Sequence, residues 1–139
     1  MEQFSDFLCF RIGSLSRRIA RYYNNRFADL GITLGQAFVL FGLMQKDGSS
    51  IKEIAQAVQL DSPAVTGLVD RLVKEGLVVR QENTEDRRSV EVMLTDQGRR
   101  VAKRAMKIAQ DFNKVLGEGT SSEDVSRLEA RLTKLENEH

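Results

Sequence analysis

Two short amphipathic helices joined by a tight turn are the feature that most restricts the fold of this 139-residue chain. Apolar residues at positions i, i+3, i+4 and i+7 share one face of a helix, and this spacing occurs twice in succession. In the first helix these residues are Ile51, Ile54, Ala55 and Val58. In the second they are Val65, Leu68, Val69 and Leu72. The pattern predicts a helix-turn-helix unit with both apolar faces on one core.

The ends of the second helix are marked by residues that start and stop helices. After a turn at Leu60-Asp61, we expect the Ser62 hydroxyl to cap the helix and Pro63 to occupy its first position, where the missing N–H removes no hydrogen bond. Gly76 then provides a left-handed stop.

The face opposite the apolar stripe of this second helix is small and polar. A helix enters the major groove of DNA, about 12 Å wide, only if its exposed side chains let the backbone approach the bases. The candidate DNA-contacting residues are Ser62, Pro63, Ala64, Thr66, Gly67, Asp70, Arg71 and Lys74. Taken by itself, the same face is equally consistent with an ordinary solvated surface.

Two β-branched runs, Leu77–Gln81 and Val90–Leu94, follow the second helix and predict a pair of strands. The residues between them are polar and mostly charged, so we expect a hairpin with a charged tip. A helix-turn-helix followed by such a hairpin is a winged helix, a fold that mostly binds duplex DNA.

The predicted hairpin tip contains Asp86, Arg87 and Arg88. A planar, weakly hydrated guanidinium suits a narrow, negatively charged minor groove, and an adjacent carboxylate can fix its direction. Arg88 is therefore the candidate for insertion, with Asp86 orienting it. The alternative is a solvated turn whose charges only protect the sheet edge from aggregation.

Long helical patterns flank the predicted winged helix. Apolar residues recur every three or four positions from Phe4 to Leu30, which predicts one helix of about seven turns. Another helix is expected from Thr33, and further helices after Thr95 and Thr120. These ends are too far apart in sequence for one small core, so we predict that they interlock with a second copy. The alternative is an intramolecular bundle.

The predicted fold is therefore mainly α with a small two-stranded β wing, in a single domain over residues 1–139. Within it, residues 33–98 would form the winged-helix DNA-binding lobe, and residues 1–32 and 99–139 would form the dimerisation helices.

Composition excludes several function classes. The only Cys and the only His, which is the last residue, supply no zinc ligand set and no nucleophile-base pair, so we expect no metal, no cofactor and no enzyme. No apolar run approaches 18 residues and arginines interrupt the N-terminal segment, so we expect a cytoplasmic protein without a membrane partner. The net charge is only +1, but the acidic residues concentrate after residue 117. The remainder is basic enough for salt-dependent DNA binding.

Four segments together resemble the MarR-type transcription regulators. They are Leu60-Asp61-Ser62-Pro63-Ala64-Val65-Thr66, Leu72-Val73-Lys74-Glu75-Gly76-Leu77-Val78, Asp86-Arg87-Arg88-Ser89 and Leu94-Thr95-Asp96-Gln97-Gly98. The resemblance implies a homodimer on a pseudo-palindromic operator of double-stranded DNA, usually a repressor. It also implies a recognition helix in the major groove and Arg88 in the minor groove.

The resemblance further implies that a small ligand or thiol oxidation relieves repression. Such ligands are often aromatic carboxylates or phenols, bound between the dimer and DNA-binding lobes. Residues that could line this crevice are Arg17, Arg18, Arg21, Tyr22 and Tyr23.

Cys9, near the start of the first helix, is similar to the lone sensor cysteine of the peroxide-sensing branch of this family, in which phenols such as Tyr23 steady the thiolate. The chain departs from that branch at Gly13 and Leu34, where tyrosines are usual. Two alternatives therefore stay open beside release by a small ligand. One is a peroxide- or thiol-sensing repressor that uses Cys9, and the other is a winged-helix protein-interaction module that does not bind DNA. Cys9 could also be an inert buried residue.

Overall fold

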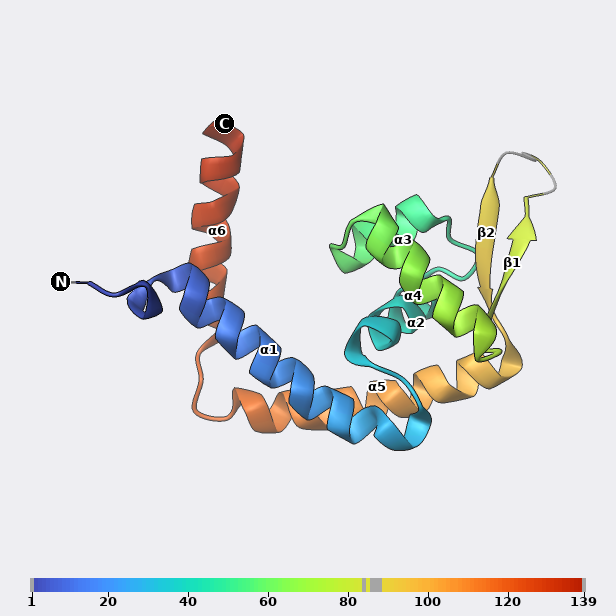
Figure 1. Ribbon diagram of the computed structural model, residues 1–139, viewed down its shortest axis with the longest axis horizontal. Helices are drawn as coiled ribbons and strands as arrows, with labels where there is room; N and C mark the ends of the chain where they lie inside the picture. The colour runs from blue at the N-terminus through green and yellow to red at the C-terminus, as the bar shows by residue number, and fades with distance from the viewer. Residues whose placement is uncertain (1, 84, 86–88, 139) are drawn as a thin grey trace. The chain divides into compact units, whose positions relative to one another are not determined.

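The computed structural model of this chain describes residues 2–83, 85 and 89–138. The elements, in chain order, are the 3-10 turn η1 (Phe4–Asp6), α1 (Leu8–Phe27), the 3-10 turn η2 (Ala28–Leu30), α2 (Leu34–Gln45), α3 (Ile51–Val58), α4 (Ser62–Lys74), β1 (Val78–Glu82), β2 (Val90–Leu94), α5 (Asp96–Gly117) and α6 (Ser122–Glu138) (Figure 1). The prediction of a mainly α fold with a two-stranded wing is confirmed. The chain forms two compact units, residues 1–108 and 109–139.

The core of the first unit is built around α2. Leu40 and Leu43 of α2 are fully buried, as are Val69 of α4 and Val92 of β2, and Ile54 of α3 is almost so. The apolar stripes predicted for α3 and α4 therefore turn inward, and the polar faces remain outside. In Figure 1, α2, α3 and α4 gather beside the β1–β2 hairpin.

The N-terminal helix is shorter than its apolar pattern predicts. Phe7 is extended, with φ −67° and ψ 140°, so it separates η1 from α1 and the expected continuous helix from Phe4 to Leu30 is wrong. At the other end α1 passes into η2, which stops at Gly31 in the left-handed conformation (φ 72°). A 3-10 turn keeps apolar residues about three positions apart, which explains why the spacing continued beyond the α-helix.

The turn between α3 and α4 shows one correction to the predicted caps. Asp61 is the N-cap of α4, because its Oδ1 accepts a hydrogen bond from the Ala64 N–H at 2.7 Å. Ser62 is the first helical residue, and Pro63 lies within the first turn, where no N–H has an intrahelical partner. Aspartate is as favourable an N-cap as serine. The observed N-cap is therefore one residue before the predicted one. Gln59 ends α3 in the left-handed conformation with φ 59°.

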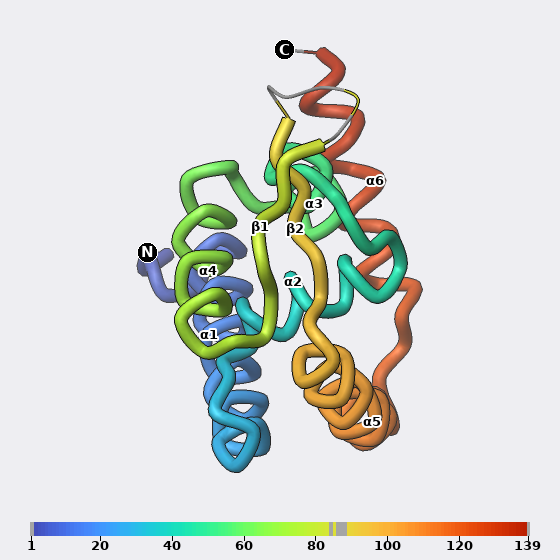
Figure 2. Tube along the Cα trace, turned by 90° about the vertical axis from the view of Figure 1, so that its right-hand side faces the viewer, coloured from blue at the N-terminus to red at the C-terminus, as the bar shows by residue number. Residues whose placement is uncertain are grey.

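Strands β1 and β2 pair antiparallel, with Val78 opposite Leu94 and Glu82 opposite Val90. The residue pair Ser49 and Val92 extends the ladder beyond β2, since the Val92 N–H donates to the Ser49 carbonyl at 2.8 Å. Figure 2 shows β1 between α4 and β2. The hairpin thereby has α4 on one side and the turn after α2 on the other.

The start of α5 is packed directly against the turn that leads into β1. The Thr95 hydroxyl donates to the Gly76 carbonyl at 2.7 Å and accepts from the Gly98 N–H at 2.9 Å. Gly98 lies so close to the Leu77 backbone that a Cβ on Gly98 would stand 1.8 Å from the Leu77 carbonyl oxygen. Only glycine fits this approach.

Asp47, in the turn after α2, connects three elements of the first unit. Its Oδ1 accepts hydrogen bonds from the Gly48 N–H at 3.1 Å and from the Leu94 N–H, at the end of β2, at 2.9 Å. Its Oδ2 accepts from Arg99 Nη2 of α5 at 2.9 Å. One carboxylate therefore joins the α2–α3 turn, the wing and α5.

The second unit consists of the last part of α5 and α6. The backbone N–H of Glu123 donates to the Ser121 hydroxyl at 3.2 Å just before the first turn of α6. Apolar side chains of α6, including Val125 and Leu132, are exposed.

Among the described residues, no single helix is long and apolar enough to span a membrane. Only together are the segments 8–30 and 34–45 long and apolar enough for a membrane span, and the chain bends by 73° between them. The second of these segments is α2, whose apolar residues form the core described above.

Candidate nucleic-acid interface

Helix α4 presents the predicted DNA-contacting residues together on its outer face. Ser62, Pro63, Ala64, Thr66, Gly67, Asp70, Arg71 and Lys74 are all exposed. Val65, Val69 and Leu72, on the same helix, are fully buried. The structure therefore orients α4 as the amphipathic spacing predicts, with its polar face toward solvent.

Gly67 leaves the backbone of α4 uncovered on this face, because glycine has no side chain. A Cβ at Gly67 would have no heavy atom within 4 Å, so the protein's own packing does not require glycine there. Glycine in a helix interior is unfavourable by about 1 kcal/mol relative to alanine. The fold therefore leaves this position open, and glycine there keeps side-chain atoms away from the backbone of the exposed face.

Asp70 has a partner that the sequence reasoning missed. Its carboxylate forms a hydrogen-bonded ion pair with the guanidinium of Arg80, in β1. Both side chains are partly exposed, 57% for Asp70 and 36% for Arg80. In the sequence, Arg80 is recognisable only as a charged residue within a β-branched run. That pattern does not show that its side chain points toward α4.

The wing residues Asp86, Arg87 and Arg88 lie outside the described residues. The structure does describe the segments that lead to them. The Asn83 N–H donates to the Ser89 carbonyl at 2.9 Å, and Asn83 Nδ2 donates to Glu91 Oε1 at 2.9 Å. The Asn83 side chain also accepts from the Glu85 N–H at 2.9 Å. The antiparallel pairing thus continues to the base of the predicted tip.

Cys9 and Tyr23 are not brought together within one chain. Cys9 is exposed in the first turn of α1, and Tyr23 lies 14 residues later on the same helix. At about 1.5 Å per residue this separates them by roughly 21 Å along the axis. Partial burial, opposed by the nearby charge of Arg26, raises the pKa of Tyr23, so this phenol stays protonated at neutral pH.

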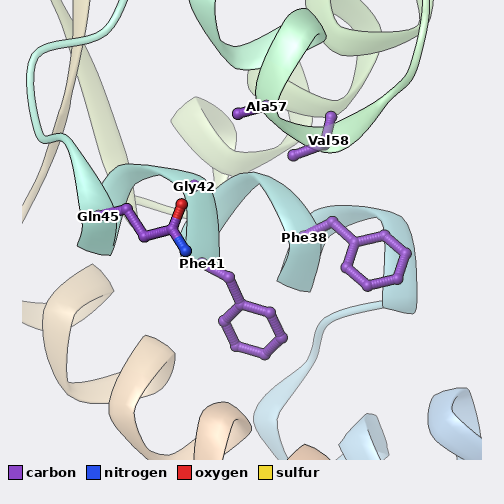
Figure 3. A pocket seen from close by; sticks show the side chains of 6 residues that line it. All are labelled: Phe38, Phe41, Gly42, Gln45, Ala57 and Val58. Atoms are coloured by element: carbon purple, nitrogen blue, oxygen red, sulfur yellow. The ribbon is translucent and has the colours of Figure 1, made fainter.

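An apolar cavity of about 240 Å³ lies between α2 and α3. Its lining residues are Phe38, Phe41, Gly42, Gln45, Ala57 and Val58 (Figure 3). Phe38 is 42% exposed. Nothing in the sequence distinguishes Phe38, because an aromatic residue on a helix next to the core is usually part of that core.

The sequence matches known regulators over nearly its whole length. The family model described as "MarR family" matches residues 32–90. The organic hydroperoxide resistance transcriptional regulator of Bacillus subtilis (strain 168) is 31% identical over 134 residues, which cover 95% of this chain and 89% of that protein.

Solved structures agree in fold. The S. aureus MepR–DNA complex superposes with a TM-score of 0.79 at 22% identity, covering 98% of this chain and 99% of that one. CouR from Rhodococcus jostii RHA1, bound to p-coumaroyl-CoA, has a TM-score of 0.79 at 24% identity, covering 97% and 95% of the two chains. An exposed recognition helix, a paired wing and this full-length similarity place the chain in the MarR family of winged-helix, DNA-binding transcription regulators.

Proposed function

We propose that this regulator is a cytoplasmic homodimeric repressor that binds a pseudo-palindromic operator and is released by a small ligand. In each copy, the outer face of α4 enters the major groove, and the wing arginine Arg88 enters the adjacent minor groove. The observation that carries this proposal is the exposed face of α4, with all its predicted contact residues outward and an unpacked Gly67 at its centre. Membership of the family favours DNA binding over a role as a protein-interaction module. It also favours regulation over catalysis.

Exposed apolar side chains support the homodimer. At the N-terminal end, Phe4 is 67% exposed and Leu8 is 60% exposed. Further exposed apolar residues are Phe7, Phe10, Ile12, Leu15, Val115, Leu116, Val125, Leu132 and Leu135. A stable monomer rarely leaves so many large apolar side chains in water. A second copy, which presents the same surfaces, would cover them in an isologous interface.

The apolar cavity between α2 and α3 supports regulation by a small aromatic effector. Two phenylalanines and the amide of Gln45 are among its lining residues, so it could hold a small apolar ring and orient one polar group. A ligand there would contact both the core helix and the first helix of the DNA-binding motif, so its binding would bear on the position of α4. CouR, a solved structure of the same fold, binds p-coumaroyl-CoA.

Thiol oxidation at Cys9 is the second candidate signal, favoured by two observations. The Cys9 side chain is exposed at the start of α1, where an oxidant can reach it. The full-length relative from B. subtilis is an organic hydroperoxide resistance regulator. In this reaction the Cys9 thiolate attacks the terminal oxygen of the hydroperoxide, the O–O bond breaks, and the sulfur becomes a sulfenic acid, while the leaving alkoxide takes a proton from water to form the alcohol.

DNA binding is tested with duplexes selected from a random-sequence library. We expect two chains per duplex, an affinity that falls steeply with salt, and weaker binding by Arg88→Ala, because each lost phosphate or groove contact reduces both affinity and salt dependence. Fluorescence anisotropy across a salt series, with sedimentation equilibrium for stoichiometry, measures all three. Failure to bind any duplex would contradict the function, while full affinity in Arg88→Ala would contradict only the role of that residue.

The two release signals are separated by treating the protein with an organic hydroperoxide. If Cys9 senses oxidants, the treated wild type loses operator affinity at least about tenfold, reductant restores it, and Cys9→Ser does not respond. Operator affinity and the mass of the Cys9 peptide are measured on the same samples. An unchanged affinity after confirmed oxidation of Cys9 would eliminate the redox signal and leave the small ligand.

A further inference from the structure

The ion pair between Asp70 and Arg80 lies on the surface that α4 offers to DNA. Asp70 belongs to the exposed face of α4, together with Thr66, Gly67 and Lys74. Because the carboxylate of Asp70 binds the guanidinium of Arg80, the guanidinium also reaches this face, although it comes from β1. A positive group is therefore neutralised at the place where a polyanion would bind.

The position of Arg80 in its strand explains how it reaches α4. Side chains alternate between the two faces of a strand, so Arg80 shares a face with Val78, which is fully buried. Across the ladder Arg80 is paired with Val92, also fully buried. The aliphatic part of Arg80 therefore lies over the edge of the core, while its charged end extends to the partly exposed Asp70.

This ion pair is poorly suited to stabilising the fold. Exposed pairs between flexible side chains contribute little, because water screens the charges and the side chains lose freedom. Arg80 would be available to bind phosphate if this carboxylate were removed. A guanidinium binds phosphate as well as it binds carboxylate, and often with two parallel hydrogen bonds.

We propose that Asp70 is a specificity-determining residue that acts by occupying Arg80. While the pair is formed, Arg80 is withheld from the phosphates of duplexes that do not fit α4, so binding to DNA of arbitrary sequence stays weak. The proposal rests on the proposed insertion of α4 into the major groove. It assigns Asp70 a positioning role in place of a direct contact with a base.

The test compares Asp70→Asn with the wild type on a 24-base-pair duplex of arbitrary sequence. The asparagine keeps the shape of the side chain but cannot hold the cation, so Arg80 becomes available to the DNA backbone. We expect affinity for the arbitrary duplex to rise about fivefold, and the salt dependence to steepen by about one phosphate contact. Affinity for a duplex selected from a random library should rise less, so that the specificity ratio falls.

Two controls separate this effect from the loss of any negative charge. Glu75→Gln removes an exposed carboxylate one residue beyond the end of α4 and is expected to change the affinity for the arbitrary duplex less than about twofold. Arg80→Gln removes the partner, and adding Asp70→Asn to it should then have no further effect on affinity or on the salt slope.

The proposal is overturned if Asp70→Asn leaves binding to the arbitrary duplex unchanged or weakens it. It is also overturned if Asp70→Asn strengthens binding equally in the Arg80→Gln background. Normal selection of an operator together with either result would reject only the role of Asp70. A wild type that binds neither duplex would reject the proposed function, and the role of Asp70 with it.

Discussion

Replacing Gly98 by alanine is expected to destabilise the folded protein by at least about 3 kcal/mol. The new Cβ would stand 1.8 Å from the Leu77 carbonyl oxygen and 2.8 Å from its carbon. Because the obstacle is backbone, α5 would have to move away from the turn before β1, and the hydrogen bonds of Thr95 would break. Urea unfolding at a fixed protein concentration measures this loss as a lower transition midpoint.

Gly42, in the middle of α2, provides a matched control. A Cβ there would meet its nearest atom, Val58 Cγ1, at 3.6 Å, which is ordinary contact. Gly42→Ala should therefore raise stability by up to about 1 kcal/mol, since alanine is the better helix former. The close approach at Gly98 would be wrong if the two alanine variants unfolded at similar urea concentrations.

The second large effect is expected at Gly67. Gly67→Leu should lower operator affinity at least about thirtyfold, because the added side chain stands between the α4 backbone and the floor of the groove. The same substitution should leave the fold intact or stabilise it by about 0.5–1 kcal/mol, because the position is open and leucine favours helix. Fluorescence anisotropy with a selected duplex measures the operator affinity, and urea unfolding of the same sample measures the stability.

Gly67→Ala serves as the intermediate member of this series, since it adds one methyl group. We expect its operator affinity to lie between those of the wild type and Gly67→Leu, with a similar gain in stability. A Gly67→Leu variant that bound DNA as well as the wild type would show that α4 does not approach the bases along this face.

Much of the DNA-binding unit could be predicted because its signals are local. The spacing of apolar residues in α3 and α4 repeats within one and two turns, and it correctly predicted which faces are buried. The strand bounds were predicted to within one residue, since β-branched runs and a polar tip are adjacent in sequence. The cap of α4 was misplaced by one residue because Asp61 and Ser62 are equally good caps and only the backbone path decides between them.

The contacts that the sequence did not predict join residues that are farther apart in the chain. Asp47 meets Arg99 across 52 positions, and Asp70 meets Arg80 across the turn between a helix and a strand. Neither spacing is a helical or strand period, so no pattern in the sequence indicates either pair. The break at Phe7 was missed for the opposite reason, because a 3-10 turn preserves the apolar spacing of the helix that it interrupts.

The three partners of Asp47 also determine how a mechanical signal travels through the first unit. A tilt of the first turn of α5 pulls on Arg99, and the same carboxylate transfers that displacement to Leu94 at the end of β2. The base of the hairpin is therefore expected to follow a displacement of the first turn of α5, both through this carboxylate and through the hydrogen bond from Thr95 to Gly76.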